Sequence, residues 1–181
     1  DITDYEITFI NHLLKVDAGK DVITISYEDK TIKSASGLFY KANKLVRDVL
    51  DDDIDGLIIG GGWYGDVRNE MIELIHKLNS QKKLLAGICG AGTFFLAVSD
   101  VLNNVSYTTP ITSWTEKHIK VFGNTDPFPK KNYIQKRVVV DKNIITAQGT
   151  AFIDFAIEIC DWFNLFDSKA DKDRFEHLYK G

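Results

Sequence analysis

The sequence predicts an α/β sandwich, with helices on both faces of a mainly parallel sheet. Strand-like and helix-like segments alternate along the chain. Two strand-like segments, residues 56–59 and 84–88, are apolar without alternating polar residues, which is typical of parallel strands buried on both faces. With 181 residues, 44% of them hydrophobic, the chain is long enough to form one such domain.

The first half of the chain supplies five of the expected elements. Residues 4–16 predict a helix, because apolar residues recur on one helical face after the capping-box spacing of Thr3 and Glu6. Residues 22–27 are short and β-branched, which favours a strand. Residues 42–50 are expected to be helical. The apolar strand 56–59 then ends abruptly in glycines, and a helical stripe over residues 71–78 follows it.

The second half repeats the order of strand, sharp turn and helix. The strand 84–88 leads into a turn, and residues 93–98 predict the start of a helix. Polar and aromatic residues with two prolines predict an irregular surface excursion over residues 114–131. The remaining expected elements are a short strand at 105–109, strands at 133–141 and 143–147, a closing helix at 152–163 and an exposed tail helix at 169–179. We therefore expect a single domain over residues 1–181, with residues 166–181 as its tail.

Composition excludes several classes of function. The net charge is −4 and the charges are interspersed, so we expect no nucleic-acid partner. No apolar run approaches the ~20 residues that cross a bilayer, and we expect a soluble, cytoplasmic protein without a membrane partner. The two cysteines, Cys89 and Cys160, are too far apart in sequence for a CxxC redox pair or a typical zinc site. We expect no metal and no cofactor.

A glycine loop follows the strand 56–59. Gly60, Gly62 and Gly65 match the G-x-G-x-x-G pattern of dinucleotide-binding turns. A nicotinamide site would need an acidic residue at the end of the next strand, where this chain has Cys89, and this difference argues against such a site. The alternative is a tight turn that presents bare backbone N–H groups to a neighbouring reactive atom.

Cys89 lies in the layout of a nucleophile elbow. Small residues surround it between an apolar strand and a helix, and a strained nucleophile turn requires such neighbours. The N–H groups at the start of the helix are expected to favour the thiolate. For Cys160, on the apolar closing helix, a buried structural role is expected instead.

These residues resemble the ThiJ/PfpI superfamily, which includes the Parkinsonism-associated deglycase and is related to class I glutamine amidotransferase domains. The resemblance covers residues 1 to about 163. Four segments carry it, in the order expected for the family: Asp4-Tyr5-Glu6 and residues 57–65, 86–93 and 144–150.

The resemblance implies a flavodoxin-like fold and a set of site residues. Cys89 would be the reactive residue, Glu6 would contact its sulfur, and the amides of Gly62 and Gly90 would form an oxyanion hole. It also implies a small-molecule substrate and a homodimer. From the residues alone, Glu6 has a second interpretation, because a capping-box glutamate bonds the terminus of its own helix.

The chain departs from the family pattern in two respects. Related proteins carry a histidine directly after the cysteine or on a later segment, and this chain has Gly90 and Thr109 at those places. His118, in the predicted excursion, could swing in, but a surface role is the alternative. The family fold also begins with a strand before the position of residue 1, so we expect that strand to precede the sequence given.

Three functions fit these observations. The first is a cysteine-dependent amidase, hydrolase or glyoxalase-deglycase-type enzyme that acts on a small carbonyl or amide substrate. The second is a thiol-based oxidative-stress sensor, which needs an accessible cysteine but no histidine. The third is a non-catalytic binding domain that keeps the scaffold.

Overall fold

The central sheet has four strands, in the order β5-β6-β8-β7. The computed structural model describes residues 2–181. In it, β5 (Gly56–Ile59), β6 (Leu84–Ile88) and β8 (Ile144–Ala147) are parallel, and β7 (Val138–Asp141) is antiparallel to β8. The prediction of a mainly parallel sheet is confirmed. Since parallel strands end at one edge of a sheet, the residues after β5, β6 and β8 meet there.

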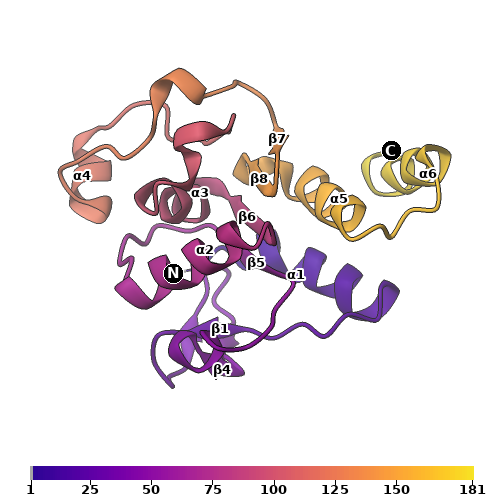
Figure 1. Ribbon diagram of the computed structural model, residues 1–181, viewed down its shortest axis with the longest axis horizontal. Coiled ribbons are helices and arrows are strands. Elements are labelled where there is room, and N and C mark those ends of the chain that lie inside the picture. Colours follow the sequence, from indigo (N-terminus) through magenta and orange to yellow (C-terminus); the bar gives the residue numbers. More distant parts are fainter. Residues whose placement is uncertain (1) are drawn as a thin grey trace.

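Helices cover both faces of this sheet (Figure 1). α1 (Tyr5–His12), continued by a π-helical turn at Leu13–Asp17, packs with α5 (Phe152–Trp162) on one face. α2 (Asn69–Ser80) and α3 (Cys89–Val98) cover the other face. The two inner strands of the sheet, β6 and β8, are buried along their whole length. Within residues 2–181, no helix combines the length and apolar character needed to cross a membrane.

Residues 22–50 form small elements rather than the strand and helix expected from the sequence. The strand at 22–27 is reduced to β1 (Ile25–Ser26), which pairs with β4 (Lys44–Leu45), and β2 (Ile32–Lys33) and β3 (Phe39–Tyr40) form a hairpin. The predicted helix at 42–50 is wrong, because β4 is followed by a single 3-10 turn at Val46–Val49. Side chains bind backbone groups of this segment: the Asn43 amide donates to the Thr24 hydroxyl group at 3.2 Å, and the Leu45 amide donates to Oδ2 of Asp48 at 3.3 Å.

The chain between α3 and β7, which includes the predicted strand 105–109 and the predicted excursion 114–131, also differs from expectation. Residues 105–109 contribute only one bridge, between Tyr107 and Tyr133, because side chains bind the neighbouring backbone groups: the Thr108 amide donates to the Thr146 hydroxyl at 2.9 Å. The excursion is not wholly irregular, since it contains α4 (Glu116–Phe122). Its start is capped where the Thr115 amide donates to Nδ1 of His118 at 3.1 Å.

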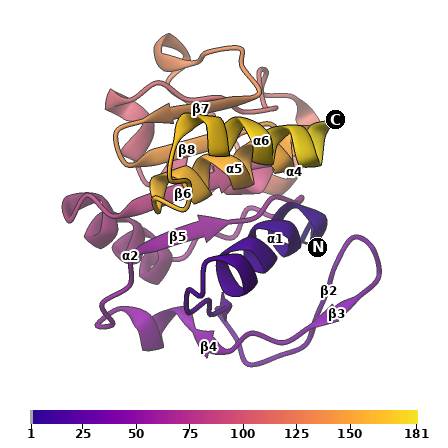
Figure 2. The same cartoon turned by 90° about the vertical axis from the view of Figure 1, so that its right-hand side faces the viewer.

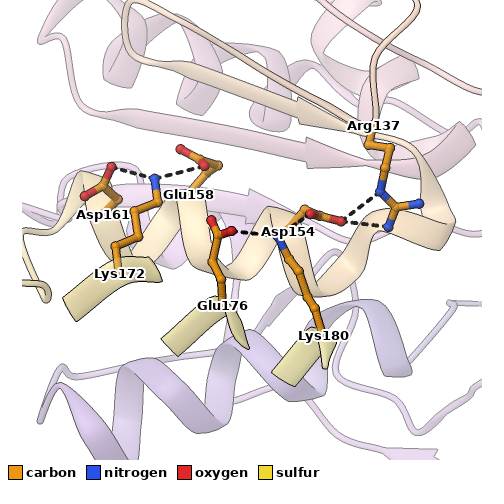
Figure 3. Close-up of polar contacts among 7 residues, drawn as sticks. All are labelled: Arg137, Asp154, Glu158, Asp161, Lys172, Glu176 and Lys180. Atoms are coloured by element: carbon orange, nitrogen blue, oxygen red, sulfur yellow. Dashed lines mark hydrogen bonds and ion pairs between the residues drawn. The ribbon is translucent and has the colours of Figure 1, made fainter. Parts of the chain in front are cut away.

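The tail helix α6 (Lys169–Lys180) is docked rather than free (Figure 2). Lys172 pairs with Glu158 at 2.9 Å and with Asp161 at 2.8 Å, both on α5 (Figure 3). Near the other end of α6, Lys180 pairs with Asp154 at 2.6 Å, and Asp154 also binds Arg137 at 2.7 Å. Partly exposed ion pairs contribute only about 0–1 kcal/mol each. Apolar contacts add to them, because Phe175 packs against the core and the ring of Tyr179 lies 5.0 Å from that of Phe9 on α1.

We expect the amides of α6 to exchange with solvent faster than those of α5. No residue of α6 is buried, whereas five residues of α5 are. Local opening is easiest where few apolar contacts are lost. Hydrogen–deuterium exchange followed by peptide mass spectrometry measures this difference, and equal protection of the two helices would contradict it.

Candidate active site

Four segments that are distant in sequence meet at the carboxyl edge of the sheet. Cys89 is the first residue of α3 and follows β6 directly, and Glu6 lies in the first turn of α1. The glycine loop follows β5, and Gly149 lies in the short turn after β8. Loops after parallel strands are the usual place for chemistry in such a fold.

Cys89 has the strained backbone that the elbow pattern predicts. Its φ angle is +63°, in the left-handed region that non-glycine residues avoid at a cost of roughly 1 kcal/mol. Two glycines make this turn possible by close packing. A Cβ added to Gly87 would lie 2.6 Å from the carbonyl oxygen of Gly92, and one added to Gly92 would lie 2.4 Å from that of Ile59.

Glu6 faces the cysteine and does not cap its own helix. It is only 1% exposed, and its Oε2 accepts a hydrogen bond from the Gly61 amide at 2.8 Å. Among residues 2–181, no side chain caps the N-terminus of α1, and the Glu6 carboxyl group bonds Gly61 instead, so the capping-box interpretation is wrong. Within residues 2–181, Oε1 of Glu6 accepts no bond from nitrogen or oxygen, and the Cys89 sulfur lies beside it.

Two glycines that sequence reasoning did not assign to the site flank this pair. A Cβ added to Gly149 would lie 2.8 Å from Oε1 of Glu6 and 2.9 Å from the sulfur of Cys89. A Cβ added to Gly61 would lie 2.2 Å from Oε2 of Glu6 and 2.4 Å from Cβ of Cys89. Any side chain at either position would therefore push into the space between the carboxyl group and the thiol.

The electrostatics differ from the sequence-based expectation. Burial raises the pKa of Cys89 to about 11, and the charge of Glu6 acts in the same direction. The amides of Gly90 and Gly62 face the sulfur and lower this pKa, but they do not outweigh burial. The expected low-pKa thiolate is therefore wrong. Burial also raises the pKa of Glu6, against hydrogen bonds from Cys89 and Gly61 that lower it.

The four predicted site residues are thus brought together. Cys89 and Glu6 are neighbours, and the amides of Gly62 and Gly90 are directed at the sulfur. Gly62 has a φ of +140°, which favours glycine at this point of the loop. Sequence could indicate Gly61 and Gly149 only as members of glycine-containing motifs, because their role depends on side chains from two other elements.

Packing explains the other glycines of the G-x-G-x-x-G pattern. A Cβ added to Gly60 would lie 2.6 Å from Cγ2 of Ile7, and one added to Gly65 would lie 2.3 Å from the carbonyl oxygen of Val121. These glycines allow the loop to approach α1 and α4 closely. The pattern therefore needs no dinucleotide to account for it.

No histidine in the part of the chain described is hydrogen-bonded to Cys89 or Glu6. Nδ1 of His118 accepts from the Thr115 hydroxyl group or amide, at 2.8 and 3.1 Å, and its ring stacks on Trp114. Thr109, at the second position where the resemblance implies a histidine, is 1% exposed and hydrogen-bonded to Thr93. The chain thus has a cysteine, a carboxyl group and backbone donors together at this edge of the sheet.

We expect iodoacetamide to label Cys89 much faster than Cys160. Cys89 is partly accessible, whereas Cys160 is 1% exposed and burial raises its pKa to about 12. Mass spectrometry after brief treatment at pH 8.5 separates the two sites. Equal labelling, or labelling of Cys160 first, would overturn the assignment of Cys89 as the accessible thiol.

Similar solved structures share the whole fold. The DJ-1 superfamily protein Atu0886 from Agrobacterium tumefaciens has a TM-score of 0.79 at 24% identity, over 99% of this chain and 94% of its own. Toxoplasma gondii DJ-1, in an oxidized form, has a TM-score of 0.76 at 22% identity, over 98% of this chain and 92% of its own. These likenesses establish the flavodoxin-like fold.

Curated relatives match part of the chain. The uncharacterized protease YdeA of Bacillus subtilis is 31% identical over 99 residues, which cover 55% of this chain and 47% of the relative. Protein DJ-1 homolog A of Arabidopsis thaliana is 30% identical over 132 residues, 66% of this chain and 30% of the relative. The model of the DJ-1/PfpI family matches residues 1–161. The chain therefore belongs to the DJ-1/PfpI family.

Proposed function

We propose that this protein is a cysteine-dependent enzyme of amidase, hydrolase or glyoxalase-deglycase type that acts on a small carbonyl or amide substrate. The observation that carries this proposal is the contact between the thiol of Cys89, whose backbone is strained, and the buried carboxyl group of Glu6, beside two backbone N–H donors. These are the parts that nucleophilic attack on a carbonyl carbon requires.

In the proposed reaction, Glu6 is the base. The thiol of Cys89 holds its proton at neutral pH because its pKa is raised. The pKa of Glu6 is also raised, and this makes its carboxylate a better proton acceptor. The sulfur forms a bond to the substrate carbonyl carbon while its proton passes to Glu6. The electron pair of the C=O double bond moves to oxygen, where the amides of Gly62 and Gly90 stabilise the charge. With an amide substrate, the electron pair on oxygen re-forms the C=O bond while the C–N bond breaks, and Glu6 gives its proton to the leaving nitrogen. Water then hydrolyses the thioester, which releases the acid and restores the thiol.

Two variants and a matched control test this proposal. We expect turnover on a panel of small dicarbonyl compounds, esters and amides to be lost in Cys89→Ser and to fall by about 10²–10⁴-fold in Glu6→Gln, which removes the base. Cys160→Ser changes the other, buried cysteine and should keep the wild-type rate. Turnover that survives in Cys89→Ser would overturn the proposed mechanism.

A second candidate function is an oxidisable thiol that senses peroxide. The lack of a histidine bonded to Cys89 within residues 2–181 favours it, because oxidation needs no general base at a substrate. The amides of Gly62 and Gly90 could bind the new oxygens. Against it stands the raised pKa of Cys89, which lowers the thiolate fraction. Mass spectrometry after graded peroxide treatment distinguishes the candidates. Preferential sulfenic or sulfinic acid at Cys89 without turnover supports a sensor. If both the oxidation and the turnover are absent, a binding domain is supported.

A further inference from the structure

Two buried threonine hydroxyl groups lie behind the strained turn. Thr93, on α3, is fully buried, and Thr109, in the segment that follows α3, is 1% exposed. Oγ1 of Thr93 lies 2.6 Å from the carbonyl oxygen of Cys89, 3.2 Å from that of Gly90 and 2.8 Å from Oγ1 of Thr109. The Ile111 amide donates to Oγ1 of Thr109 at 3.2 Å. The proposed mechanism uses neither hydroxyl group.

The direction of these hydrogen bonds follows from counting protons. Carbonyl oxygens only accept, so the single hydroxyl hydrogen of Thr93 is best placed toward Cys89, its shortest contact. Thr109 then donates to Thr93. The reverse arrangement would take the hydrogen away from the Cys89 carbonyl and leave the Thr109 hydrogen without an acceptor among the described residues. The chain of donors therefore runs from Ile111 through Thr109 and Thr93 to the Cys89 carbonyl.

That carbonyl belongs to the same peptide unit as the Gly90 amide. A peptide unit is planar, so a bond that fixes its oxygen also fixes the direction of its N–H group. A hydrogen bond to the oxygen also polarises the unit and makes the N–H group a stronger donor. The Gly90 amide is one of the two groups that face the Cys89 sulfur.

We propose that Thr109 is a positioning residue for the oxyanion donor Gly90, acting through the Thr93 hydroxyl group on the Cys89–Gly90 peptide unit. This inference rests on the proposed function, since it assigns the Gly90 amide to the site. A hydroxyl group on α3 often bonds the carbonyl four residues earlier, so the Thr93 contact alone would be ordinary helix geometry. The link to Thr109 adds a second segment, and Gln148 secures that segment by donating to the Thr109 carbonyl at 2.9 Å.

The rate of Cys89 alkylation by iodoacetamide, measured against pH, tests the proposal without any substrate. Thr109→Val keeps the shape but removes the hydroxyl group. We expect alkylation at pH 8.5 to slow about threefold to tenfold, the worth of one neutral hydrogen bond, and the profile to move to higher pH. Thr109→Ser should stay within about twofold of the wild type. The titratable groups coupled to Cys89 are Glu6 and Tyr5, both on α1, and all variants keep them.

Ser99→Ala is the matched control. Ser99 is also buried, and its hydroxyl group donates to the Phe95 carbonyl at 2.9 Å, at the end of α3 away from Cys89. Unchanged alkylation in Thr109→Val, or equal slowing in Ser99→Ala, would overturn the proposal. If Thr109→Val does not fold, Thr109→Ala and Thr109→Ser replace it, because they differ only in the hydroxyl group, and equal rates in this pair would overturn the proposal as well. A wild-type protein without turnover would instead count against the proposed function.

Discussion

Gly149→Ala is expected to destabilise the protein by about 1–3 kcal/mol through overpacking at the site. The added Cβ would lie 2.8 Å from Oε1 of Glu6, 2.9 Å from the Cys89 sulfur and 3.2 Å from the Cys89 Cβ, all closer than ordinary contacts. The backbone at Gly149 does not have a positive φ, so the cost is steric. Urea unfolding at pH 7 measures it.

Two further variants separate this effect from a general intolerance of larger residues beside Cys89. A Cβ added to Gly90 keeps 3.5 Å from its nearest neighbour, so Gly90→Ala should change the free energy of unfolding by less than about 0.5 kcal/mol. In a Cys89→Ala background the sulfur is gone, and Gly149→Ala should cost clearly less than in the wild type. An equal cost in both backgrounds would show that the methyl group does not press on Cys89.

Gly149→Ala should also reduce any turnover by about 10²–10⁴-fold, because the added methyl group drives Glu6, the proposed base, away from Cys89. The loss should appear in kcat, since the added methyl group acts on the reacting groups. A Gly149→Ala protein that folds and turns over substrate at the wild-type rate would show that the contact between Glu6 and Cys89 is not needed for the reaction.

The sheet could be predicted because its signal is local and repeated. β6 and α5 carry long apolar patterns, and their positions agree with the structure to within a few residues. The segments that failed, residues 42–50 and 105–109, are short, and some of their backbone groups bond side chains such as Thr24 and Thr146. A short segment has too few residues for its periodicity to show whether its backbone groups bond side chains or form a regular helix or strand.

At the site, residue identities were easier to predict than energies. The elbow and glycine motifs indicated Cys89 and Gly62, and the resemblance added Glu6 and Gly90. The pKa of Cys89 was expected in the wrong direction, because the helix terminus is visible in sequence whereas burial and a carboxylate from another element are not. The roles of Gly61, Gly149 and Thr109 depend on contacts between segments far apart in the chain, which no local pattern encodes.

Glu6→Gln is expected to stabilise the protein at neutral and alkaline pH while removing its proposed activity. The carboxyl group is buried, burial raises its pKa, and among the described residues Oε1 accepts no bond from nitrogen or oxygen. A carboxyl group whose pKa is raised on folding favours the folded state below its unfolded pKa of about 4.3, and this stability is lost as pH rises through the folded pKa. Glutamine does not titrate and still offers an oxygen to the Gly61 amide.

The stability advantage of Glu6→Gln over the wild type should therefore grow between about pH 4 and pH 8, toward roughly 1–3 kcal/mol, the cost of an incompletely paired buried group. Urea unfolding at several pH values measures this difference. Other carboxyl groups, among them Asp53 and Asp171, have lowered pKa values and titrate mainly below this range, and they are common to both proteins and cancel in the comparison. Glu116→Gln, which removes an exposed carboxylate on α4, should show no comparable growth. An advantage that does not change with pH would mean that folding leaves the pKa of Glu6 unchanged, which would contradict the raised pKa on which its proposed role as a base rests. A growing advantage together with lost turnover would show that the site keeps Glu6 at the expense of stability, as expected for a catalytic carboxylate.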